Sequence, residues 1–143
     1  MNVDNIKAIK YLTLANQFYL TEGNFLSVAT VNVLLAETSI KEKQNIDAIG
    51  YYKKVYDFYI KEQSLNTGAF YLLKVAYLLI ECDKHEEANK NLKLTYYYYN
   101  KNKLTSFKCL KLLFDIGIIY LYLKDTMQCR NWLLLCTEYK KTI

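Results

Sequence analysis

The stretch NIDAIGYYKKVYDFYIKEQSLNTGAFYLLKVAYLLIE, residues 45–81, decides the fold. Each of its halves repeats apolar side chains at the three- and four-residue spacing that is typical of an amphipathic helix. A short polar link, SLNTG at residues 64–68, separates the two halves and carries residues that favour helix ends. The stretch therefore predicts a helical hairpin.

The same unit recurs along the chain at a step of about forty residues. The first helices repeat a small residue at Ala8, Ala48, Ala88 and Cys129, and the second helices at Ala29, Ala69 and Cys109. A small residue at a crossing, with a large one a turn away, allows two helices to pack closely. Because one hairpin cannot bury its own apolar face, consecutive hairpins are expected to stack.

These repeats predict an all-α fold, a right-handed α–α superhelix of about seven antiparallel helices that resembles a tetratricopeptide solenoid. An irregular helical bundle is the alternative that such spacing leaves open. No segment alternates polar and apolar residues over a length that would indicate a strand.

We expect a single domain, residues 1–143, that is a piece of a longer protein. Hairpins are predicted at about 4–42, 45–82 and 85–123, with a last helix at 126–141. Because no partner helix follows this last helix, Trp132 and Leu135 are expected to be partly uncovered. Asp4 and Asn45 are expected to cap helix starts, and Gly23 to end the first helix in a left-handed turn.

Composition favours a cytoplasmic protein. The chain of 143 residues is 52% hydrophobic, lacks proline and carries a net charge of +5. The start of the chain does not resemble a signal peptide, because Asp4, Lys7 and Lys10 interrupt any apolar core. The longest apolar stretch, 109–123, contains Lys111 and Asp115 and is too short and too charged to span a bilayer.

Residues that could carry catalysis are scarce. His85 is the only histidine, and the four glycines are isolated, so neither a serine-type triad nor a phosphate-binding loop is indicated. Cys82 and His85 form a single Cys-x-x-His pair, whereas a structural zinc site needs four ligands. Cys109 and Cys129 fall at packing positions and are interpreted as buried, reduced thiols. We predict no enzymatic activity, no metal and no cofactor.

Four consecutive tyrosines at residues 96–99, next to lysines, raise the alternative of base stacking. On a helix, four consecutive residues point in four directions, so two or three of them must join the packing. No base-reading pair recurs at the forty-residue step either. The tyrosines are interpreted as part of the core, and no nucleic-acid partner is predicted.

Two motifs carry a family resemblance. SLNTGA at residues 64–69, followed by LLKVA at 72–76, resembles the central hairpins of soluble NSF attachment proteins, the SNAP family. The preceding AIGYY at 48–52 and DFYIKEQS at 57–64 resemble the helix that family members place there. The resemblance runs along essentially the whole chain and implies the central segment of an α- or γ-SNAP-like protein.

What the resemblance implies is an adaptor in vesicle trafficking. Such a protein binds the SNARE complex, a syntaxin-type helical bundle, and links it to the NSF ATPase, which takes the bundle apart after membrane fusion. By the same resemblance, the contacts with NSF and the peripheral contact with membranes belong to regions outside this chain.

The resemblance also implies partner-binding residues. Lys74 coincides with a basic position on the SNARE-binding face and Leu104 with an apolar contact position, while Lys108 and Lys111 lie close to a further basic position. Four other positions that are basic in α-type members are not basic here: Asn24, Thr30, Phe70 and Leu110. Two alternatives remain open, a generic tetratricopeptide-like module for another helix or peptide and a basic RNA-binding helical repeat.

Overall fold

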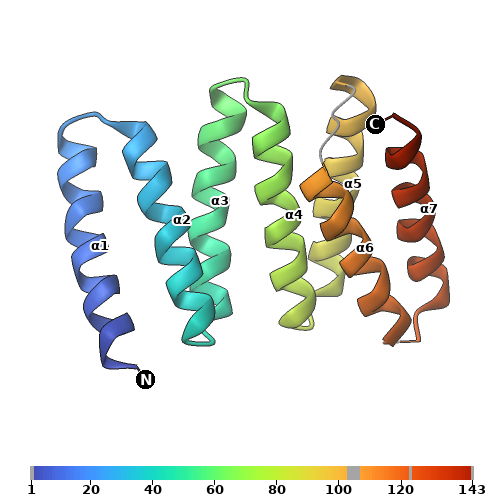
Figure 1. Cartoon of the computed structure of the whole chain (residues 1–143), viewed down its shortest axis with the longest axis horizontal. Helices are drawn as coiled ribbons and strands as arrows, with labels where there is room; N and C mark the ends of the chain where they lie inside the picture. The colour runs from blue at the N-terminus through green and yellow to red at the C-terminus, as the bar shows by residue number, and fades with distance from the viewer. Residues whose placement is uncertain (1, 103–106, 123, 143) are drawn as a thin grey trace.

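The computed structural model describes residues 2–102, 107–122 and 124–142. Within these ranges the chain forms seven α-helices and no strand. The helices are α1 (Val3–Thr21), α2 (Phe25–Lys41), α3 (Asn45–Lys61), α4 (Leu65–Glu81), α5 (His85–Asn102), α6 (Phe107–Tyr122) and α7 (Thr126–Thr142). They stand side by side in alternating directions, with the two chain ends at opposite ends of the row (Figure 1).

Packing follows the order of the chain. Each helix from α1 to α4 packs against the next one, α6 packs against α7, and α4 also contacts α6. Contacts between successive helices, with a further contact between the alternate helices α4 and α6, are consistent with a stacked hairpin solenoid. The predicted α-helical solenoid is therefore confirmed.

Most of the small residues predicted at helix crossings lie in the core, but Ala8 is only half-buried because α1 packs against α2 alone, and the side chain of Cys109 lies outside the described residues. Ala48 and Ala88 are fully buried, and Cys129 is buried at the equivalent position of α7. The larger residues one turn on from the first two, Tyr52 and Leu92, are also buried. Side chains of the middle helices are thus covered from both sides, which is where a solenoid concentrates its stability.

Within the described residues, one type of turn makes five of the helix connections. Its left-handed residue is Gly23, Lys43, Gln63, Asp83 or Lys124, with φ between 58° and 69°. After α2, the N–H of Lys43 donates to the carbonyl of Ile40 at 2.9 Å, and the N–H of Gln44 donates to that of Ser39 at 2.8 Å. These two bonds form a Schellman motif, which satisfies carbonyl groups at the end of a helix. In all five turns the next helix begins two residues after the left-handed residue.

Two predicted helix caps are wrong. The side chain of Asn2, not that of Asp4, caps α1 by accepting the N–H of Asp4 at 2.9 Å. Asn45 is the first residue of α3, and Gln44 occupies the capping position without a side-chain hydrogen bond. The fixed turn length after Lys43 places the helix start at residue 45, so it overrides the capping preference of the asparagine.

The prediction that Trp132 and Leu135 are partly uncovered is wrong. Their side chains are only 5% and 9% exposed and belong to the core. The turn at Lys124 folds α7 back against α6, which covers this face of the last helix. The exposed apolar side chains of α7 are instead those of Met127 and Leu134.

Candidate partner-binding face

Lys74 lies on α4, half-buried between two aromatic rings. Its Nζ is 5.3 Å from the centroid of the Tyr52 ring and 5.1 Å from that of the Phe70 ring. At these distances the ring faces attract a cation. The two rings therefore fix the direction of the lysine side chain on a face formed by the even-numbered helices.

A cavity of about 250 Å³ opens beside Lys74. It is lined by Ile40 of α2, Tyr52 of α3, Lys74, Tyr77 and Leu78 of α4, and Leu112 of α6. Most of this lining is apolar, and Lys74 supplies the only charged side chain among the lining residues. The cavity thus combines an apolar hollow with one cation.

Carboxylates also lie close to this cavity. Burial raises the pKa of Tyr52, and the nearby charge of Glu37 on α2 raises it further. Burial likewise raises the pKa of Tyr77, followed by the charges of Glu81 on α4 and Asp115 on α6. The face is therefore mixed in charge and not uniformly basic.

The other predicted binding residues lie on or next to α6. Lys111 is exposed on this helix, which packs against the helix that carries Lys74. Lys108 falls within α6, but the structure does not describe its side chain. Leu104 lies outside the described residues. Of the four predicted residues, Lys74 and Lys111 are thus placed on two helices in direct contact.

The four positions that are not basic have local structural roles. Asn24 caps α2, since its Oδ1 accepts the N–H of Ser27 at 3.1 Å. The hydroxyl of Thr30 donates to the carbonyl of Leu26 at 3.1 Å. Phe70 and Leu110 are half-buried against the core. These side chains stabilise the helices and their packing.

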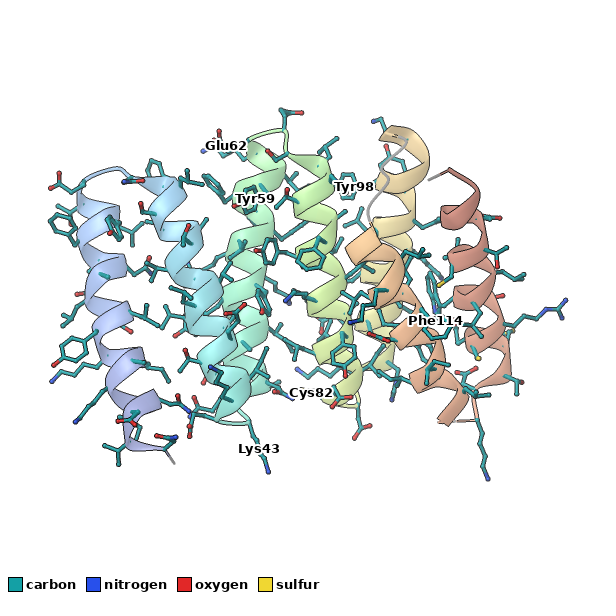
Figure 2. All side chains as sticks on the ribbon, viewed as in Figure 1. Lys43, Tyr59, Glu62, Cys82, Tyr98 and Phe114 are labelled. Atoms are coloured by element: carbon teal, nitrogen blue, oxygen red, sulfur yellow. The ribbon has the colours of Figure 1, made fainter. Side chains whose placement is uncertain are left out.

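Two exposed apolar residues on the even-numbered helices were not found by the sequence reasoning. Leu34 on α2 is 43% exposed, and Phe114 on α6, labelled in Figure 2, is 51% exposed. Counted back from the left-handed turn residues Lys43, Asp83 and Lys124, the positions equivalent to Lys74 are Leu34 on α2 and Asp115 on α6, so Phe114 lies one residue before the equivalent position. The forty-residue step from Lys74 identifies Leu34, but on α6 it falls one residue short of the equivalent position.

The consecutive tyrosines form a separate surface on α5. A shallow hollow of about 490 Å³ is lined by Lys93, Tyr96, Tyr97 and Lys101. The hydroxyl of Tyr96 donates to Glu138 of α7 at 3.3 Å, and the hydroxyls of Tyr98 and Tyr56 are 3.0 Å apart. Tyr98 points toward α4 in Figure 2. Among the described side chains of this run, Tyr97 is the exposed one, and one exposed ring is a poor platform for stacking successive bases.

The described residues contain no group of three or more His, Cys, Asp or Glu side chains that would hold a metal ion. Cys82 and His85 lie in one turn, where the Nε2 of His85 is 3.7 Å from Oδ1 of Asp83. Over the same described ranges, no helix is long and apolar enough to cross a membrane.

The sequence profile of one protein family matches residues 1–142 of the chain. That family is described as "Soluble NSF attachment protein, SNAP". The chain belongs to the SNAP family. SNAPs are an adaptor family and not an enzyme family. Neither the curated proteins nor the solved structures gave a match to the chain.

Membership of the SNAP family confirms the resemblance drawn from the two motifs in residues 45–81. In this SNAP the LLKVA motif, residues 72–76, lies in α4. It contributes buried core residues and the half-buried Lys74.

Proposed function

We propose that this chain is the partner-binding part of an adaptor that grips a SNARE bundle and links it to the NSF ATPase. The ATPase then takes the bundle apart after membrane fusion. The observation that carries the proposal is the family match over residues 1–142. We place the protein in the cytoplasm, peripheral to membranes, with the contacts to NSF and to the membrane made by other regions of the complete protein.

The shape of the solenoid supports this role. Its even-numbered helices present equivalent positions in succession, so a rod-shaped ligand can contact several helices at once. Lys74, which by resemblance coincides with a basic position of the family, is held between two rings, and Lys111 is exposed on the neighbouring helix. Complementary charge of this kind steers an acidic partner toward the face and fixes its register.

Binding to an assembled SNARE bundle tests the proposal directly. We expect the chain to bind an immobilised bundle and to lose affinity between low and moderate salt. Lys74→Ala should weaken binding by about 3- to 10-fold at low salt, whereas Lys93→Ala, a lysine on α5 outside this face, should leave it unchanged. Absence of binding, or equal effects of the two substitutions, would contradict the proposal.

The apolar cavity beside Lys74 favours a second candidate, a tetratricopeptide-like module for a single helix or peptide. The two candidates differ in what they bind. An adaptor for the bundle prefers the assembled four-helix form, whereas a peptide-binding module prefers one isolated helix. Competition between the assembled bundle and one of its helices in monomeric form separates them.

A further inference from the structure

The cavity beside Lys74 is large enough to hold a small molecule. An apolar cavity of about 150 Å³ is enough to hold benzene, and this one measures about 250 Å³. Apart from Lys74, its wall consists of apolar or aromatic side chains from α2, α3, α4 and α6: Ile40, Tyr52, Tyr77, Leu78 and Leu112. An aromatic ring or a short alkyl chain therefore fits into the cavity and leaves water when it enters.

The charge of Lys74 is available to such a ligand. Its Nζ lies 5.3 Å from the centroid of the Tyr52 ring and 5.1 Å from that of the Phe70 ring. Ring faces attract an ammonium group without neutralising its charge. Among the described residues, no carboxylate is in ion-pair contact with this Nζ. Because the two rings already order the lysine side chain, an anion that pairs with it has less of that ordering cost to overcome.

Other charges near the cavity limit which ligand it accepts. Glu37 lies close to Tyr52, while Glu81 and Asp115 lie close to Tyr77. These carboxylates repel a ligand that carries several negative charges, and Lys74 disfavours a cation inside the cavity. A ligand with a single negative charge next to an apolar group satisfies both the lysine and the apolar wall.

We propose that this cavity is a binding site for a small amphiphilic monocarboxylate. The aromatic or alkyl part of the ligand enters the cavity between α2, α4 and α6. Its carboxylate accepts a charge-assisted hydrogen bond from Nζ of Lys74. The site is built from residues 40–112 alone and does not depend on the proposed adaptor role.

Three probes with the same phenyl group and different charges test the site: phenylpropionate, phenylpropionamide and phenylpropylamine. An NMR titration of the isotope-labelled chain gives the Kd of each probe and also shows which residues it affects. From the affinity that small ligands reach per atom, we expect phenylpropionate to bind with a Kd of roughly 0.1–4 mM. The neutral amide should bind about 3- to 10-fold more weakly, and the amine at least about 10-fold more weakly.

Four variants assign the two parts of the ligand. Lys74→Met should abolish the preference for the carboxylate over the amide, whereas Lys74→Arg retains a cation and should keep it. Ile40→Trp fills the cavity and should weaken phenylpropionate binding by about 10-fold. The matched controls are Lys93→Met and Leu94→Trp on α5, which should leave the Kd unchanged. Leu94 has the same exposed fraction as Ile40, 37%.

Equal affinities for the three probes would overturn the inference, and so would an unchanged Kd in both Lys74→Met and Ile40→Trp. Spectral changes centred on Lys93 and Tyr97 would place the site in the hollow on α5 and would also overturn it. The same holds if no saturable change occurs up to about 10 mM phenylpropionate. If the spectrum shows that Ile40→Trp is unfolded, the comparison of Lys74→Met with Lys74→Arg decides.

Discussion

Replacing glycine by alanine should have opposite effects at two positions inside helices. At Gly50 on α3, a Cβ atom would meet nothing within 4 Å. Alanine is favoured over glycine in a helix by about 1 kcal/mol, so Gly50→Ala should stabilise the fold by about that amount. At Gly117 on α6, a Cβ atom would lie 2.8 Å from Cδ2 and 3.0 Å from Cγ of Leu133 on α7. Overpacking of this kind costs about 1–3 kcal/mol, so Gly117→Ala should be neutral or destabilise by up to about 2 kcal/mol.

Gly23 allows the corresponding test in a turn between two helices. Its φ is +69° and no atom lies within 4 Å of its ideal Cβ, so only the backbone conformation opposes a side chain there. The left-handed conformation costs an L-residue about 1–2 kcal/mol, partly offset by the lower chain entropy of alanine in the unfolded state. Gly23→Ala should therefore destabilise by roughly 0.5–1.5 kcal/mol.

Urea unfolding followed by circular dichroism measures all three glycine variants under one set of conditions. The expected order of stability is Gly50→Ala, then the unaltered chain, then Gly23→Ala and Gly117→Ala. If Gly117→Ala stabilised the protein as much as Gly50→Ala, the close contact between α6 and α7 would be refuted. Likewise, a stabilising Gly23→Ala would refute the left-handed turn.

Four further predictions follow from single contacts and from burial. Asn24→Ala removes the cap of α2 and should lower the free energy of unfolding by about 1 kcal/mol in urea titrations; an unchanged midpoint would contradict the cap. The Tyr120 hydroxyl donates to Asn89 at 2.8 Å, so Tyr120→Phe should cost about 1–2 kcal/mol by the same measurement. Burial raises the pKa of Tyr120 to about 12. The stability that its neutral form contributes is therefore fully present below pH 10 and is lost as the pH rises toward 12. A spectrophotometric titration would follow the ionisation of the phenol. Burial also raises the pKa of Cys136 to about 11, so alkylation followed by mass spectrometry should label the half-buried Cys82 before Cys136.

The fold followed from the sequence because its determinants recur. The forty-residue step placed Ala48 and Ala88 correctly in the core, since small residues at helix crossings leave a periodic mark in the sequence. The residue types in the turns show no comparable pattern. Gly23 was recognised because glycine favours a left-handed conformation, whereas Lys43 adopts the same conformation without a residue type that predicts it.

The candidate site was predicted only in part. Lys74 and Lys111 were named from the family resemblance, and the structure places them on packed helices. The cavity was not predicted, because its walls come from four helices whose mutual positions no local pattern encodes. Leu34 and Phe114 carry no functional signal as single residues, and only the structure shows that both are exposed on even-numbered helices.

The first four left-handed residues fall at 23, 43, 63 and 83, which divides this part of the chain into units of twenty residues. Deleting residues 44–83 would join Lys43 directly to Lys84 and bring α5 in after α2 through an unchanged turn. Deleting residues 44–63 would instead put α4 where α3 belongs, and every later helix would run the opposite way. Gene rearrangements within this array should therefore be tolerated when they add or remove whole pairs of units, and an odd number should leave an unfolded product.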